Sequence, residues 1–209
     1  MGRRAVLRML GVLAVGLVLW RVQEVFSALM APSESRQRFT GSREEASVTG
    51  NLYPTTNWLG DPIPQIDSTL WRLRIQGEVE REVTLSYREM LDLGVASCRA
   101  TLDCTGGWYT VQRWSGVPLR ALLEQAGVKD GARSLLFRST TGYARRFPLE
   151  EAADLLLATH VEDEALSPGH GFPLRLVAPA YRGYDWVKWV VELEVSCEPG
   201  WLEPPLPLR

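Results

Sequence analysis

Apolar and polar residues alternate in several short stretches of the chain, which is the pattern of β-strands with one buried face. Residues 71–75 and 82–85 alternate in this way on either side of Gly77, so the simplest arrangement is a hairpin. We expect further strands at residues 95–104, 108–114, 134–138, 174–178 and 190–195. Within the stretch 95–104, the apolar side chains share one face with Cys104. A cysteine therefore ends this strand on its apolar face.

Helix signals are short and lie between the expected strands. Ser86 and Glu89 have the spacing of a capping box at the start of a short helix. Residues 118–126 begin with proline and are followed by glycine, which is typical of the two ends of a helix, and residues 149–157 are a third candidate. These patterns predict an α+β fold with a strand-rich mixed sheet and short helices.

The N-terminus combines paired arginines with an apolar stretch. The run Arg3-Arg4-Ala5-Val6-Leu7-Arg8 fits the twin-arginine export pattern, and the twelve residues 9–20 are all apolar or glycine. That length suits the core of a signal peptide, since a complete membrane span needs about 20 apolar residues. The sequence therefore predicts export through a pathway that carries folded proteins.

Beyond Arg21, apolar residues recur at helical spacing, and no convincing small-x-small cleavage site precedes the next loop. An N-terminal hydrophobic helix, kept as a membrane anchor over residues 5–31, is therefore favoured. Cleavage near Ala28 or Ala31, which would release a soluble protein, is the alternative. Both interpretations place the protein in the periplasm or on the extracytoplasmic face of the membrane. The expected organisation is a signal or anchor at 1–31, an extended segment at 32–64 and one catalytic domain at 65–209.

Charge differs between the two ends of the chain. Residues 1–40 contain six Arg and two Glu, a net charge of +4. Because the whole 209-residue chain carries -2, the remainder holds 17 basic and 23 acidic residues, a net charge of -6. The basic side chains are scattered among carboxylates and form no stripe, which argues against a nucleic-acid binder.

Three cysteines allow at most one disulfide, and none has zinc-ligand spacing. On base rates Cys104 is a buried structural cysteine. Because Gly106 and Gly107 follow it and let the backbone pass close to a bulky ligand, its thiolate is also a candidate soft metal ligand. A cysteine nucleophile would need a histidine base, and neither His160 nor His170 lies in a motif that signals one.

Several separate motifs carry a family resemblance. They are Leu102-Asp-Cys-Thr-Gly-Gly107, Trp114-Ser-Gly-Val-Pro-Leu-Arg-Ala-Leu-Leu123, His170-Gly-Phe-Pro-Leu-Arg-Leu-Val-Ala-Pro179 and Tyr181-Arg-Gly-Tyr-Asp-Trp-Val-Lys-Trp189. In this order they resemble the oxidoreductase molybdopterin-binding domain of sulfite oxidases and of the periplasmic methionine sulfoxide reductase catalytic subunit. The resemblance covers residues 51–197 and implies the sulfite-oxidase-type fold. The residues around Cys104 depart from the patterns of both groups.

The resemblance implies a molybdenum-molybdopterin cofactor and a set of residues that hold it. Cys104 would coordinate molybdenum together with two pterin sulfurs. His170, where the closest periplasmic relatives have Asn, and Arg175 would hold the pterin and its phosphate. The remaining matched positions are Asn51, Tyr53, Pro54, Ser139, Trp186, Val187 and Lys188, with Thr140 or Thr141 as alternatives to Ser139. Arg99 and Arg113 are interpreted as surface residues.

The implied function is an extracytoplasmic molybdenum-pterin oxidoreductase that transfers an oxygen atom to or from a small sulfur compound of the sulfoxide or sulfite class. The direction of reaction stays open. Because the sequence has no haem-binding signature and no extra C-terminal dimerisation domain, we expect a monomer with a separate haem or quinone-linked membrane partner. The alternatives are a cofactor-holding electron-relay subunit and a cofactor-free membrane-anchored interaction domain, although Cys104, Arg175 and Lys188 argue against loss of the cofactor.

Overall fold

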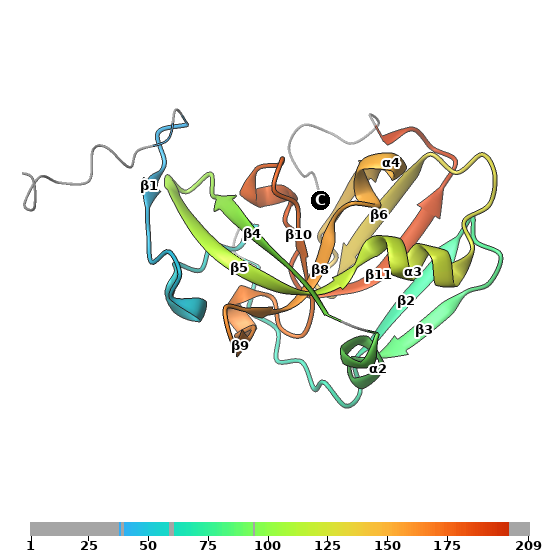
Figure 1. The fold of residues 1–209 in the computed structure, drawn as a ribbon, viewed down its shortest axis with the longest axis horizontal. Helices are drawn as coiled ribbons and strands as arrows, with labels where there is room; N and C mark the ends of the chain where they lie inside the picture. The colour runs from blue at the N-terminus through green and yellow to red at the C-terminus, as the bar shows by residue number, and fades with distance from the viewer. Residues whose placement is uncertain (1–37, 39, 59–60, 94, 201–209) are drawn as a thin grey trace, which may run out of the picture. The chain divides into compact units, whose positions relative to one another are not determined.

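Two β-sheets contain most of the regular structure of the protein (Figure 1). The strand-rich α+β class expected from the sequence is therefore confirmed. The expected N-terminal hydrophobic helix lies outside the described residues, and the predicted domain boundaries stay predictions. Among the residues described, no helix combines the length and the apolar character needed to cross a membrane. The computed structural model describes residues 38, 40–58, 61–93 and 95–200.

The first sheet is built around one long strand, β5, which lies beside β4 (Figure 1). β5 pairs antiparallel with β4 along most of its length, antiparallel with β8 near its C-terminal end, and parallel with β1 at its first residues. The end of β4, the start of β5 and the strand β1 therefore meet at one edge. The six strands are β1 (Arg43–Glu44), β4 (Ala96–Asp103), β5 (Trp108–Pro118), β8 (Leu156–Val161), β9 (Glu164–Ala165) and β10 (Arg175–Val177).

The second sheet has the order β3-β2-β11-β6-β7. β2 and β3 form the antiparallel hairpin expected around Gly77. β11 pairs parallel with β2 and antiparallel with β6, so the sheet is mixed, as predicted. Its strands are β2 (Arg72–Gly77), β3 (Val83–Ser86), β6 (Ser134–Ser139), β7 (Ala144–Pro148) and β11 (Val190–Ser196).

Short helices connect the strands. The capping box is confirmed, because the Ser86 hydroxyl accepts a hydrogen bond from the Glu89 backbone N–H and the Glu89 carboxylate accepts one from the Ser86 N–H. The next helix begins directly after Pro118 and ends just before Gly127, whose φ of +70° is a left-handed conformation that glycine adopts easily. The α-helices are α2 (Tyr87–Asp92), α3 (Leu119–Ala126) and α4 (Leu149–Ala152), and the 3-10 helices are η2 (Gly50–Leu52), η4 (Pro168–His170) and η5 (Gly183–Asp185).

The helix predicted at residues 149–157 is wrong in its second half. α4 ends at Ala152, and β8 begins at Leu156 between β5 and β10. Because both faces of β8 are buried at its start, the strand begins with the apolar run Leu156-Leu157-Ala158 instead of an alternating pattern. β5 approaches β8 so closely that a Cβ on Gly116 would lie 2.0 Å from the Leu157 carbonyl oxygen.

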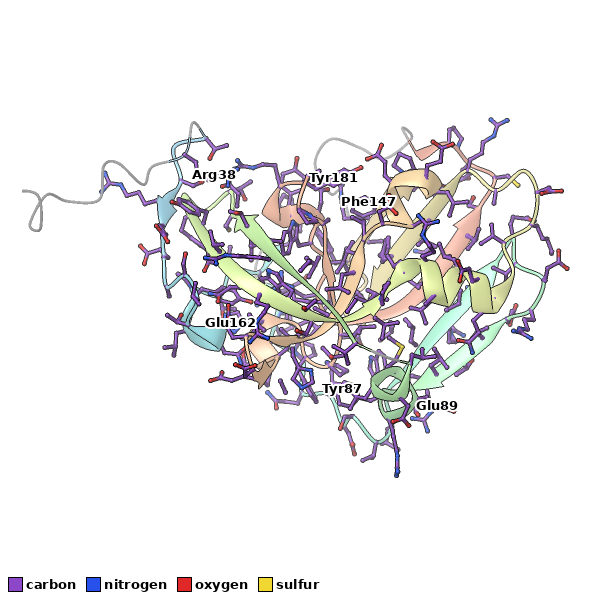
Figure 2. All side chains as sticks on the ribbon, in the orientation of Figure 1. Arg38, Tyr87, Glu89, Phe147, Glu162 and Tyr181 are labelled. Atoms are coloured by element: carbon purple, nitrogen blue, oxygen red, sulfur yellow. The ribbon has the colours of Figure 1, made fainter. Side chains whose placement is uncertain are left out.

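The core fills the space around the two sheets. Its largest fully buried side chains include Trp114, Phe137 and Phe147, and Phe147 packs edge-on against Tyr181 at 4.8 Å (Figure 2). β4 follows the predicted pattern in that Leu102 is buried with the apolar face. Asp103, on the opposite face, is also buried, which the alternation did not predict.

Candidate functional site

Cys104 follows the last residue of β4 and begins the tight turn that leads into β5. Its backbone N–H donates to the Trp108 carbonyl at 2.9 Å, and its carbonyl accepts from the Gly107 N–H at 3.2 Å. Gly107 has a φ of +86°, a conformation that favours glycine. The Cys104 Sγ accepts a contact from the Gly106 N–H at 3.3 Å. The Gly-Gly pair therefore allows the tight turn, and Cys104 as a residue is buried, with 8% of its surface exposed.

Two pockets meet at Cys104. The larger encloses about 520 Å³ of empty space, part of it open to solvent, and the smaller about 320 Å³. A group bound to the thiol has room to extend to both sides. The residues that line both pockets are Thr56, Cys104, Gly183, Trp186 and Lys188.

Arg175 lines the smaller pocket as a buried cation. Its Nη1 donates to the Tyr53 hydroxyl at 3.0 Å and to the His170 carbonyl at 3.1 Å, while its buried Nε has no hydrogen-bond partner. The guanidinium lies against the rings of Trp114 and Trp186, at 4.9 and 5.6 Å from their centroids. No carboxylate in the described part of the chain pairs with it, and burial lowers its pKa. A buried cation of this kind is favourable beside an anion.

Lys188 lines both pockets and is the second cation of the site. Its Nζ donates to Asn57 Oδ1 at 2.6 Å and to the Gly169 carbonyl at 2.8 Å. Burial, and then the charge of Arg175, lower its pKa from 10.5 to about 7. Within the residues described, no carboxylate forms an ion pair with this ammonium group.

His170 lines the smaller pocket but uses both ring nitrogens on the protein. Because a carbonyl only accepts, the Nε2 at 2.9 Å from the Tyr53 carbonyl carries the proton, and Nδ1 accepts from the Ser167 hydroxyl at 2.7 Å. Burial lowers the pKa of His170 from 6.5 to about 4, so the ring is neutral at pH 7. Its visible role is to fix Tyr53, whose ring lies 4.0 Å away. Direct contact with a cofactor stays a prediction.

The other predicted residues divide into two groups. Tyr53 and Pro54 line the smaller pocket, Ser139 lines the larger and Trp186 lines both. Val187 and Asn51 line neither: Val187 is buried with its carbonyl bound to the Leu176 N–H, and Asn51 hydrogen-bonds to Glu164, Ala165 and Ser167. Asn51 therefore holds the segment around it in place, and a contact with the cofactor is a prediction for all six residues.

Several lining residues were missed by the sequence analysis. Asn57 is the clearest case, because it accepts the Lys188 hydrogen bond from a segment without periodicity. Trp189 follows Lys188 in a left-handed conformation with φ of +55°, which is strained for a bulky residue, and its Nε1 donates to the Pro168 carbonyl at 2.7 Å. The other missed residues are Thr56, Trp58, Asp61, Thr105, Tyr143, Gly183 and Tyr184 in the larger pocket and Leu102 and Trp108 in the smaller one.

These features fit a cofactor that brings its own metal and carries a phosphate. One buried thiol supplies a soft ligand, and two cations without carboxylate partners face the same space. No group of three or more His, Cys, Asp or Glu in the described residues is arranged to hold a metal ion. All three cysteines are free, so Cys98 and Cys197 are not paired with each other.

The chain is similar to several known proteins. It is 28% identical to an uncharacterized oxidoreductase, YuiH, of Bacillus subtilis over 79% of this chain and 90% of that protein. It is 26% identical to an NADH nitrate reductase of Solanum lycopersicum, over 66% of this chain but only 19% of the reductase. Among solved structures it is similar to the sulfane dehydrogenase SoxCD from Paracoccus pantotrophus, with a TM-score of 0.68 and 27% identity over 74% of this chain and 45% of that chain.

Residues 27–201 match the model of the oxidoreductase molybdopterin binding domain. This match confirms the family expected from the motifs, and with it an oxidoreductase that uses a molybdenum-pterin cofactor. The sulfane dehydrogenase similarity agrees with a strand-rich fold of the sulfite oxidase type. The chain therefore belongs to the oxidoreductase molybdopterin binding domain family.

Proposed function

We propose that this protein is an extracytoplasmic molybdenum-pterin oxidoreductase that transfers an oxygen atom to or from a sulfur compound. The observation that carries the proposal is the position of Cys104 where two pockets meet, beside the cations Arg175 and Lys188. Neither cation pairs with a carboxylate in the part of the chain that the structure describes.

Different residues of the site bind different parts of the cofactor. Cys104 is the metal ligand, and its thiolate is the form that coordination requires. Arg175 and Lys188 bind the pterin phosphate, because the buried Nε of Arg175 has no other partner and an ammonium is a compact point charge for phosphate. Ser139, at the wall of the larger pocket, offers a hydroxyl to the pterin. When bound, the cofactor supplies a metal centre that exchanges an oxygen atom and two electrons with the substrate.

Hydrogen bonds and ring contacts hold the lining residues of the smaller pocket in place. Tyr53 is held through its carbonyl by His170 and through its hydroxyl by Arg175. Trp114 and Trp186 cover the guanidinium and keep water from its faces. Fixed donors in a site with little water bind an anion more strongly than mobile surface donors do.

The sulfur substrate and the location rest on other observations. One solved relative is a sulfane dehydrogenase, and the motifs resemble those of enzymes that act on sulfite and on sulfoxides. The paired Arg3 and Arg4 before residues 9–20 support export of the folded, loaded protein. Electrons then pass to or from a separate haem or quinone-linked membrane partner, and the domain works as a monomer.

The test uses protein exported from a molybdenum-replete host. We expect molybdenum and pterin in the wild type, oxidation of a reduced dye with methionine sulfoxide or dimethyl sulfoxide, or reduction of an oxidised dye with sulfite, and loss of turnover in Cys104→Ser. Turnover with nitrate alone, the substrate in the name of the plant relatives, would contradict the sulfur class. A loaded protein without turnover on any of these compounds would favour the electron-relay alternative.

A further inference from the structure

The carboxylate of Asp103, the residue before Cys104, contacts four side chains. The hydroxyls of Ser42 and Thr40 donate to it at 2.6 and 2.9 Å. Nη1 of Arg182 donates at 3.1 Å, and Nε of Arg38 forms an ion pair at 3.1 Å. The Asp103 side chain is only 7% exposed, whereas the two arginines remain about one-third exposed, so the buried carboxylate is the centre of the group.

Ser42, Thr40 and Arg38 belong to the segment before β1 and to its first turn. This segment continues into β1, which pairs with the first residues of β5, and the Arg43 N–H donates to the Gly107 carbonyl at 3.0 Å. Figure 2 shows Arg38 close to the C-terminal end of β4. Asp103 therefore joins this segment to the turn that begins at Cys104.

Arg182 belongs to the loop that covers the backbone of Cys104. A Cβ on Gly183 would lie 3.0 Å from both the Asp103 carbonyl oxygen and the Cys104 Cα, so the loop rests directly on this part of β4. The same loop supplies Tyr184 to the larger pocket. At its other end it is held by the buried pair of Asp185 and Arg145, at 2.8 Å.

We propose that Asp103 is a positioning residue that fixes the Cys104 thiol and holds the loop 181–186 against it. We call the clamp the group of side chains around this carboxylate, which is Arg38, Thr40, Ser42, Asp103 and Arg182. It holds the metal ligand Cys104 in place from two sides, the segment before β1 and the loop 181–186. The importance of the clamp for catalysis rests on the proposed function. Without the negative charge of this carboxylate, the two guanidinium groups lose their shared counter-charge. The buried Ser42 hydroxyl, which also makes a longer contact with the Cys104 carbonyl at 3.5 Å, loses a charged acceptor.

Asp103→Asn is the main variant, because the amide keeps the size of the carboxylate but loses its charge. Asp154→Asn is the matched control: Asp154 also pairs with an arginine, Arg120, at 2.6 Å, but its side chain is 75% exposed and its ion-pair partner lies in α3, outside the clamp. Both are made in a Cys98→Ser, Cys197→Ser background so that Cys104 is the single thiol.

The first readout is the labelling rate of Cys104 by a small maleimide in protein without cofactor, with circular dichroism as the check on folding. We expect Asp103→Asn to react at least about tenfold faster than the background and Asp154→Asn to react at the background rate. We expect Arg182→Gln to raise the labelling rate by part of this amount. The double variant Asp103→Asn, Arg182→Gln should react no faster than Asp103→Asn alone, because both substitutions disrupt the same clamp. A folded Asp103→Asn variant with the background labelling rate would overturn the proposal.

The second readout is made on cofactor-loaded protein. We expect Asp103→Asn to shift the thiolate-to-metal absorption band and to release pterin faster than Asp154→Asn does. An unchanged band together with an unchanged release rate would also overturn the proposal. If the wild type contains no molybdenum or pterin, the proposed function fails, and the labelling result still decides the role of Asp103.

Discussion

The Tyr53 hydroxyl accepts a hydrogen bond at 3.0 Å from Nη1 of Arg175, a residue 122 positions further along the chain. The same guanidinium nitrogen also donates to the His170 carbonyl. This contact ties the extended N-terminal segment to the wall of the pocket. It also replaces the carboxylate that would usually accompany a buried arginine.

Tyr53→Phe removes this acceptor and keeps the ring. We expect the free energy of unfolding of the cofactor-free protein to fall by about 1–3 kcal/mol, because a buried charged donor loses one of its partners. Denaturant unfolding measures the change. Tyr87→Phe is the control, since Tyr87 packs against Trp71 and Phe172 and its hydroxyl has no hydrogen bond to a described residue. Equal effects of the two substitutions would contradict the importance of the Arg175 contact.

His170 makes stability depend on pH. Its pKa is lowered from 6.5 to about 4 in the folded protein. Between these two pH values the imidazole is therefore protonated in the unfolded chain and neutral in the folded chain. The contribution of the neutral ring to the free energy of unfolding is fully present above about pH 6.5 and is lost as the pH falls towards 4. The largest loss is about 3 kcal/mol. His170→Gln cannot titrate. We expect the stability difference between wild type and variant to shrink over this range, and a constant difference would refute the account.

Lys188 makes anion binding depend on pH around neutrality, above the range in which His170 titrates. Since its pKa is about 7 without a bound anion, the ammonium charge is present below this pH and is lost above it. We expect sulfate, used as a probe of the phosphate site, to bind cofactor-free protein up to about tenfold more weakly at pH 8 than at pH 6. Lys188→Arg stays charged and should show a flatter profile. Identical profiles in titration calorimetry would exclude this role for Lys188.

Gly116 tests the contact between β5 and β8. In Gly116→Ala the new Cβ would meet backbone atoms of Leu157 and Ala158, which cannot rotate away. We expect a loss of about 3 kcal/mol or more in the free energy of unfolding. Gly106→Ala is the comparison, because its nearest contact is 3.4 Å and its φ is not left-handed. A Gly116→Ala variant as stable as Gly106→Ala would show that the two strands are further apart.

Local patterns were sufficient for part of the fold. The hairpin of β2 and β3, the capping box of α2 and the strand β4 that leads to Cys104 each depend on residues close together in sequence. β7 was not predicted because two arginines interrupt its pattern. The structure shows that one of them, Arg145, is buried against Asp185, 40 positions away. Such a partner cannot be read from a local pattern.

The candidate site shows the same limit. Cys104, Arg175 and Lys188 lie in motifs, and the structure brings all three to the lining of the smaller pocket. Asn51 stands in the expected extended segment and was predicted to hold the cofactor, but it is Asn57 in the same segment that accepts a hydrogen bond from Lys188. A segment without periodicity gives no sign of which side chain faces inward, because its path is set by contacts more than 100 residues away.

The most direct test of the central claim is the number of sulfur ligands at molybdenum, measured by X-ray absorption at the molybdenum edge on protein from a molybdenum-replete host. If Cys104 is the protein ligand to the metal, the wild type has one sulfur more than Cys104→Ser, because the pterin sulfurs remain in both. An equal sulfur count in the two proteins, or wild-type protein without molybdenum, would contradict the account.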